Sequence, residues 1–214
     1  MPADALVALE PRKTPIQARS ALTVEAISEA TVQVLLSHGA ERLTTTRVAQ
    51  RAGVSVGTLY QYYPNKQSLL FAVLENHLNS VMARVEAVCE RACHKPLAQM
   101  IREMVEAFVD AKMERADISV ALYRVSADLG GPALLKRISQ RSRRAVEAML
   151  QTAQDIKVPP DKSAIDMMLA AMAGAMRSLL EAGPSPTTVR MSREQLVLLC
   201  QSYMAAATAP DRRQ

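Results

Sequence analysis

The sequence contains no tryptophan, and aromatic residues make up only 3% of its 214 residues. Its seven glycines are spread along the chain, and runs of β-branched residues are few, so a β-sheet would be hard to build. Hydrophobic residues nonetheless reach 49%, and 12 residues are methionine. A chain of this length and composition can bury a core, and we predict an all-α fold of about nine helices.

The sequence also lacks a long apolar run. The first ten residues include Asp4 and Glu10 and no sustained apolar core, which argues against a secretory signal. The longest uncharged apolar stretch, residues 167–176, is shorter than the roughly 20 residues that a membrane-spanning helix needs. We therefore expect a cytoplasmic protein with no membrane partner, in which the three cysteines are reduced thiols rather than a disulfide framework.

Motifs of catalysis are missing as well. There is no phosphate-binding glycine loop, no Gly-x-Ser-x-Gly and no His-Glu-x-x-His, and the three histidines are scattered. Cys89 and Cys93 have the i, i+4 spacing of two ligands on one helix face, but beyond the adjacent His94 nothing nearby completes a tetrahedral site. We expect no enzyme activity, no cofactor and no metal, and interpret these cysteines as packing residues; a redox role for them or for Cys200 is left open.

The chain does contain an informative segment from Thr44 to Lys66, TTTRVAQRAGVSVGTLYQYYPNK. A side-chain oxygen of Thr44 or Thr45 can cap a helix over residues 45–52. Gly53 then suits the left-handed conformation in which helices often end. Ser55 is a second capping candidate and opens a helix from residue 56 to about residue 63. Two short helices joined by a tight glycine turn are a helix-turn-helix.

The outer face of the second predicted helix carries hydroxyl, amide and phenol groups, because Leu59 and Tyr63 are spaced to face inward. No Asp or Glu occurs in residues 43–74. Four basic residues lie in or beside this window: Arg42, Arg47, Arg51 and Lys66. Such a surface suits the phosphates and base edges of double-stranded DNA, so we expect a DNA operator as a partner.

The sequence that follows, GTLYQYYPNKQSLL, closely resembles the signature of the tetracycline-repressor-like (TetR) family of bacterial transcription regulators. The resemblance covers roughly residues 23–74, including Ile27, Gly39 and the Asn-Lys-x-x-Leu-Leu pattern that starts at Asn65. It implies a transcription regulator, by family default a repressor. We expect a flexible basic arm over residues 1–18, a helix-turn-helix DNA-binding domain over 19–66 and a helical effector-binding and dimerisation domain over 67–214.

The resemblance also implies roles for individual residues at matching positions. Thr45 and Lys66 would bind phosphate, and Thr46 would lie where a neighbouring side chain can reach a base. The start of the recognition helix would face base edges with Val56, Gly57 and Thr58. The backbone or flanking bases would be contacted by Tyr60, Gln61 and Tyr62.

Apolar periodicity predicts the remaining helices. They are expected over residues 23–38, 66–91, 97–114, 117–127, 133–156, 163–182 and 192–207. The helix over 133–156 carries a basic run, which we interpret as a solvated face rather than a second nucleic-acid surface.

The last two predicted helices are the best candidates for a homodimer interface, since one recognition helix reaches only a few base pairs and two copies are needed for a palindrome. Residues 167–176 are apolar almost all round and so require more than one neighbour. The resemblance further implies a small, apolar effector, for which we name five pocket residues: Met100, Met104, Phe108, Tyr123 and Met149. The alternative is a helical small-molecule-binding or scaffold protein without sequence-specific DNA binding, which leaves residues 44–66 unexplained.

Overall fold

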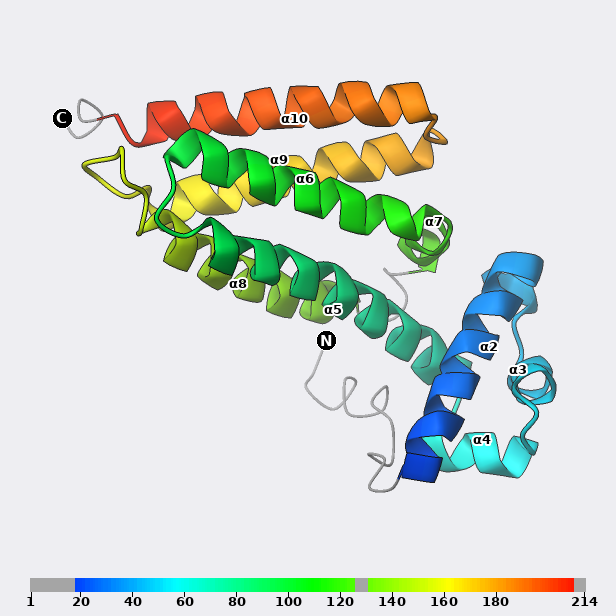
Figure 1. The fold of residues 1–214 in the computed structure, drawn as a ribbon. Coiled ribbons are helices and arrows are strands. Elements are labelled where there is room, and N and C mark those ends of the chain that lie inside the picture. Colours follow the sequence, from blue (N-terminus) through cyan, green and yellow to red (C-terminus); the bar gives the residue numbers. More distant parts are fainter. Residues whose placement is uncertain (1–17, 126–130, 210–214) are drawn as a thin grey trace. The chain divides into compact units, whose positions relative to one another are not determined.

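The computed structural model describes residues 18–125 and 131–209, and within these ranges it contains nine helices and no strand (Figure 1). The predicted all-α class is confirmed. The predicted basic arm lies outside the described residues except for its last residue, Ala18, which already belongs to a helix. Of the three basic residues assigned to the arm, Arg12 and Lys13 lie outside the described residues, whereas Arg19 belongs to a helix.

The helices keep the numbering of Figure 1. They are α2 (Ala18–Arg42), α3 (Thr45–Ala52), α4 (Val56–Tyr62), α5 (Lys66–Ala92), α6 (Leu97–Glu114), α7 (Ala116–Val125), α8 (Gly131–Leu150), α9 (Lys162–Glu181) and α10 (Pro186–Ala207).

Two predicted boundaries were wrong. The helix expected over 133–156 ends at Leu150, because the chain turns there and the Gln154 N–H donates to the Lys95 carbonyl instead of continuing the helix. The last helix begins at Pro186 rather than at residue 192. Ser185 caps it in a reciprocal pair with Thr188, and proline is tolerated at the first helical position, where its missing N–H has no intrahelical partner anyway.

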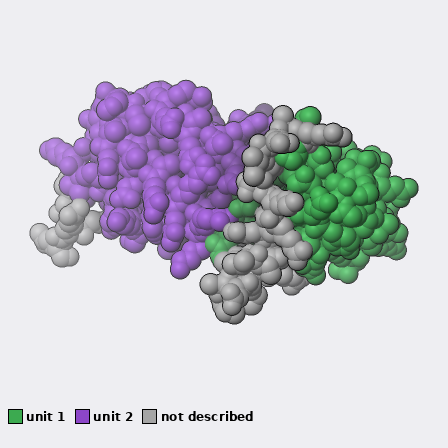
Figure 2. Space-filling model, turned by 90° about the horizontal axis from the view of Figure 1, so that it is seen from below, with its two compact units in different colours: residues 1–78, 117–135 green, residues 79–116, 136–214 purple. Residues whose placement is uncertain are grey.

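The chain divides into two compact units, which Figure 2 colours separately. Unit 1 comprises residues 1–78 and 117–135, and unit 2 comprises residues 79–116 and 136–214. In unit 1, α2 packs against α3 and α3 packs against α4. The core of these three helices is closed to solvent, with at most 2% exposure for Ile27, Leu43, Val48, Leu59 and Tyr63.

In unit 2, α6 packs against both α9 and α10, and α9 packs against α10. α9 thus has more than one neighbour, as predicted for residues 167–176. Within the single chain these neighbours cover one face of α9: Met167 is 60% exposed, and Ala170, Ala173 and Gly174 are exposed as well. Among the described residues, α9 is also the one helix that is long and apolar enough to cross a membrane by length and composition alone.

Unit 2 buries one lysine. The side chain of Lys112 on α6 is only 5% exposed, and desolvation lowers its pKa to about 8. Burial disfavours the charged ammonium, so the folded state releases this proton at lower pH than the unfolded state does.

We predict opposite stability changes for alanine at two neighbouring glycines. Gly53 has φ 68°, and a side chain there should destabilise the protein by about 1–2 kcal/mol. Gly57 lies within α4, where an added Cβ would come no closer than 3.7 Å to Ser55 Oγ, so Gly57→Ala should stabilise by about 0.5–1 kcal/mol. Thermal unfolding of both variants measures the difference; equal shifts would contradict the backbone argument.

We predict that the burial of Lys112 makes the free energy of unfolding depend on pH. The folded pKa lies below the ordinary value of 10.5, so between pH 8 and 10.5 the unfolded state binds more protons and stability rises with pH. The gain should be on the order of 2–3 kcal/mol and absent from Lys112→Met. Denaturant unfolding of both proteins across this pH range isolates the effect, because other groups titrate alike in the two proteins. A constant difference between them would refute the prediction.

Candidate nucleic-acid interface

The amino end of α3 brings two predicted site residues together. Thr44 is the capping residue, since its Oγ1 accepts the Arg47 N–H at 3.2 Å. Thr45 is therefore released from capping, and its hydroxyl lies 3.1 Å from the Tyr60 hydroxyl on α4. The sequence had left the choice between the two threonines open. A hydroxyl pair joining α3 to α4 now stands beside the backbone N–H groups of the α3 amino end.

The turn between α3 and α4 has the predicted geometry. Gly53 ends α3 in the left-handed conformation, with φ 68° and ψ 27°, and its N–H reaches the carbonyls of Ala49 and Gln50. Ser55 caps α4 by accepting the Thr58 N–H at 2.9 Å. Leu59 and Tyr63 are buried as expected, and burial raises the pKa of the Tyr63 phenol.

The remaining predicted residues of α4 lie on its outer side with different exposure. Gly57 and Gln61 are exposed, and Tyr60 is 43% exposed. Val56, Thr58 and Tyr62 are half-buried. The Thr58 hydroxyl lies 2.8 Å from Ser55 Oγ, so its orientation is tied to the cap of the helix that carries it. Thr46, on α3, is exposed.

Two cations meet at the carboxyl end of α2. Arg47 Nη1 donates to the Arg42 carbonyl, and Lys66 Nζ donates to the Glu41 carbonyl at 3.4 Å. The last carbonyls of a helix carry partial negative charge and attract cations. Lys66 is also the first residue of α5, where Asn65 Oδ1 accepts the Ser68 N–H at 2.8 Å. These contacts hold Arg47 and Lys66 beside the helix-turn-helix before any ligand is present.

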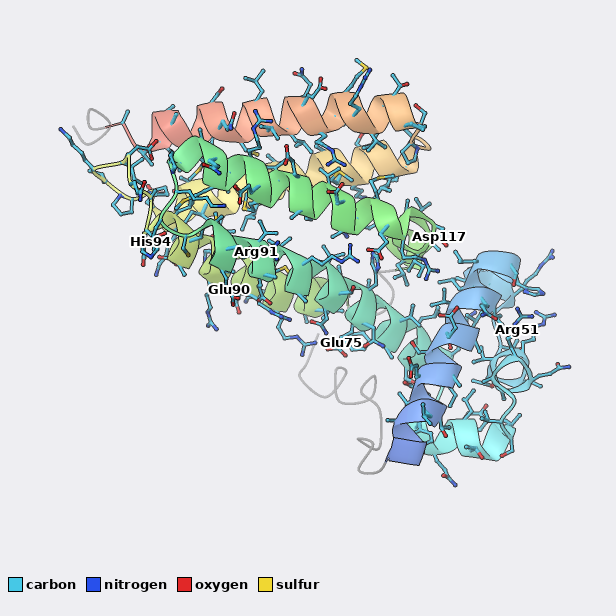
Figure 3. All side chains as sticks on the ribbon, viewed as in Figure 1. Arg51, Glu75, Glu90, Arg91, His94 and Asp117 are labelled. Carbon is cyan, nitrogen blue, oxygen red and sulfur yellow. The ribbon has the colours of Figure 1, made fainter. Side chains whose placement is uncertain are left out.

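A third cation, Arg51, is held from α2 by a residue that the sequence did not single out. Its Nε donates to Gln33 Oε1 at 2.5 Å, and Gln33 Nε2 donates to Glu29 Oε1 at 3.2 Å. Figure 3 labels Arg51 on α3. No local pattern reveals Gln33, because the contact joins side chains of two helices across 18 positions of sequence.

The five predicted effector-pocket residues fall in both units. Met100, Met104 and Met149 lie fully buried in unit 2. Phe108 is half-buried in unit 2, and Tyr123 is half-buried in unit 1. Met149 lines a groove with a volume of about 420 Å³, formed by α5 and α8. The effector pocket stays a prediction.

Two arginines of the basic run of α8 pair with acidic residues of unit 2. Arg141 binds Glu86 through two nitrogens at 2.5 and 2.6 Å. Arg143 binds Asp166 at 2.8 Å.

All three cysteines are free thiols. Burial, followed by the neighbouring Cys93, Glu86 and Glu90, raises the pKa of Cys89 to about 12, and burial raises that of Cys200 to about 11. Reactive cysteines have a low pKa, so neither has the character of a redox sensor. Over the described ranges, no group of three His, Cys, Asp or Glu side chains is arranged to hold a metal ion.

Family models match both parts of this architecture. The model for the amino-terminal region of bacterial regulatory proteins of the tetR family matches residues 21–73, and the model for a tetracyclin repressor-like C-terminal domain matches residues 96–204. The chain belongs to the TetR family. The first match contains α3, α4 and the turn between them, and the second reaches from the start of α6 into α10.

Curated proteins match parts of the chain. A nucleoid occlusion factor SlmA from Mannheimia succiniciproducens is 43% identical over 47 residues, 22% of each chain. The chain spans between 22% and 50% of the length of the first curated relatives that it matches. These matches therefore relate a part of the TetR regulator to part of each relative.

Solved structures share the fold over most of the chain. A putative TetR-family regulator from Mesorhizobium loti has a TM-score of 0.72 at 15% identity, covering 90% of this chain and 100% of that one. SmeT, the repressor of the Stenotrophomonas maltophilia multidrug efflux pump SmeDEF, has a TM-score of 0.65 at 20% identity, covering 88% and 91%. At these identities the likeness concerns the fold.

The two threonines at the start of α3 should respond differently to alanine. Thr44→Ala removes the cap and should lower the free energy of unfolding by about 1 kcal/mol. Thr45→Ala leaves that cap intact and serves as the matched control, with a smaller change. Chemical denaturation distinguishes them, and a larger loss for Thr45→Ala would contradict the assignment of the cap.

Proposed function

We propose that this TetR-family protein is a DNA-binding transcription regulator, most simply a cytoplasmic repressor without catalytic activity, which binds a palindromic operator as a homodimer. The observation that carries the proposal is the geometry of α3 and α4. The turn at Gly53 sets a short, doubly capped helix on a buried core, and its outer side presents hydroxyl, amide and phenol groups with no carboxylate. Hydrogen-bonding groups of this kind suit phosphates and base edges.

The recognition helix would read DNA with short side chains. Gly57 is exposed, and alanine would fit there without a clash, so the fold of α4 does not require glycine at this position. Because Gly57 has no side chain, the helix could approach the bases closely at this position. Val56 offers apolar contact, as to a thymine methyl, and Thr58 offers one hydroxyl. Specificity must also draw on DNA shape and on two paired copies.

The phosphate contacts would come from groups that the protein already holds in place. Thr45 and Tyr60 form a hydroxyl pair, and Lys66 is fixed beside the end of α2. Ordering these side chains before binding reduces the entropy that the complex loses. Because phosphates occur in every sequence, these residues would set affinity, whereas α4 would set preference.

DNA binding can be tested with sites selected from random duplexes by the purified protein. Tyr60→Phe and Lys66→Ala should weaken all duplexes alike, and Lys66→Ala should reduce the salt slope of log K by about 1. Thr58→Ala should instead reduce the preference for the selected site. Gly57→Ala should bind more weakly although it is at least as stable as the wild type.

Fluorescence anisotropy at several salt concentrations measures these changes. The regulator proposal fails if the wild type binds all duplexes with the same affinity, as simple attraction to a polyanion would produce, and prefers no site. The division between affinity and preference fails if Thr58→Ala and Lys66→Ala lose affinity in the same proportion for every sequence.

The dimer would form through α9 and α10. Their open face carries four large apolar side chains that are at least half exposed: Met167, Met191, Leu198 and Leu199. A groove of about 670 Å³ on this face is lined by Leu198, Leu199 and Tyr203 among others, and Ala175 gives α9 a small residue beside it. Small residues allow helices to approach closely, and exposed apolar patches mark interaction surfaces. Two helices from each copy would complete an isologous four-helix interface.

Leu198→Asp should convert the dimer to a monomer at micromolar concentration, because a carboxylate would be buried without a partner. Leu22→Asp is the matched control, since Leu22 on α2 is 67% exposed and lies outside this face. Sedimentation velocity measures the state of each protein. A wild-type monomer, or equal dissociation of both variants, would exclude this interface.

The effector would be a small, apolar molecule that binds the DNA-incompetent state more tightly, since equal affinity for both states shifts nothing. Support comes from the methionine-rich interior of unit 2, where Met100, Met104 and Met149 are buried together with Met168 and Met172. Methionine adapts its shape to varied apolar partners. SmeT, whose fold this chain shares, is the repressor of a multidrug efflux pump.

A further inference from the structure

Three sulfur-bearing side chains line the groove between α5 and α8 in unit 2. They are Cys89 from α5, Cys93 directly after the end of α5, and Met149 from α8. Cys89 and Met149 are 2% and 1% exposed, whereas Cys93 is half-buried. The groove has a volume of about 420 Å³. The three side chains therefore line one groove, and Cys93 is the most exposed of them.

Hydrogen bonds fix the backbone beside Cys93 and Met149. His94 follows Cys93 and adopts a left-handed conformation with φ 61°. Its N–H donates to Thr152 Oγ1 at 2.9 Å, and the Thr152 hydroxyl donates to the Met149 carbonyl at 2.7 Å. Figure 3 labels His94 and Glu90 on this part of the chain. The residue after Cys93 is thus connected to Met149 through one side chain, which sets the two helices in register.

The spacing of the two cysteines does not suit a disulfide. Residues i and i+4 of a helix have Cβ atoms about 5–6 Å apart, whereas a disulfide needs about 3.5–4.5 Å. Cys93 Sγ instead donates to the Cys89 carbonyl at 3.4 Å, in the turn that directly follows α5. At this spacing the pair can be joined only by an atom placed between the two sulfurs.

The chemistry of these ligands selects the kind of atom. Thiolate and thioether sulfur are soft ligands that favour Cu(I), whereas Mg²⁺ and Ca²⁺ require oxygen. Structural zinc sites use four nitrogen or sulfur ligands from His and Cys, and this site has two. The charged residues of the groove are balanced, with Glu86 and Glu90 against Arg141 and Arg144, and Arg141 is already bound to Glu86. A monovalent cation would therefore meet no excess of positive charge.

We propose that Cys89, Cys93 and Met149 form a binding site for Cu(I). The ion forms bonds to the two Sγ atoms and to the Met149 Sδ, the two thiol protons pass to solvent, and no electron is transferred. The Met149 thioether supplies the third ligand that the spacing of cysteines and histidines along the chain did not reveal. Binding concerns the protein alone and does not depend on the proposed operator.

The test is an anaerobic titration of the full-length, reduced protein with Cu(I) against a coloured Cu(I) chelator. One Cu(I) per chain should withstand the chelator, and an unbuffered titration should release protons on binding. Cys89→Ser and Cys93→Ser should each weaken binding by more than about 100-fold, beyond what changes outside the ligand shell produce. Met149→Leu should weaken it by about 10-fold or more.

Two controls are matched to these variants. Cys200→Ser removes a buried cysteine of α10, and Met168→Leu removes a buried methionine of α9; both should bind Cu(I) as the wild type does. Thermal unfolding of each apo variant shows whether it folds. The proposal is overturned if the wild type binds no stoichiometric Cu(I), or if folded Cys89→Ser and Cys93→Ser retain wild-type affinity.

Discussion

The arrangement of the helix-turn-helix depends on one backbone conformation, the left-handed turn at Gly53. With φ 68° at that residue, the chain leaves α3 and enters α4 within three residues. This direction places Leu59 on the core formed with Val48 and Ile27, and all three are fully buried. The same direction carries Tyr60 back to Thr45, so that their hydroxyls meet at 3.1 Å. A residue unable to adopt positive φ would disturb both the core and the hydroxyl pair.

The sequence predicted those helix bounds that depend on residues close together in the chain. The bounds of α3 and α6 were correct because caps, glycine and proline lie within a few residues of the helix ends. The start of α10 was predicted six residues too late, since apolar periodicity does not reveal that Pro186 occupies the first position of the helix. The contacts of Arg51 with Gln33 and of Lys66 with Glu41 were beyond prediction, because they depend on how separate helices pack.

The candidate site shows the same division between features that the local sequence predicts and contacts that depend on how helices pack. Family resemblance named residues of α4 together with Lys66, and the structure adds how three of them are held: Thr58 by Ser55, Tyr60 by Thr45, and Lys66 by the end of α2. Sequence could not choose between Thr44 and Thr45 as the cap, since both are threonine and adjacent. The choice matters chemically, because the hydroxyl that does not cap is the one available to a phosphate.

The two units differ in what their surfaces leave unsatisfied. In unit 1 the polar groups of the helix-turn-helix are anchored within the protein, so a DNA partner would replace water around an ordered surface. In unit 2 the open face of α9 and α10 is apolar, with Leu198 57% and Leu199 50% exposed. Burying such side chains is favourable by about 25 cal/mol per Å² of apolar area, which favours the association that we propose for this face. The proposed regulator needs both properties. The dimer would fix the separation of its two helix-turn-helix motifs, and the ordered polar surface would convert that separation into sequence preference, because only motifs spaced by about one helical turn can occupy both half-sites.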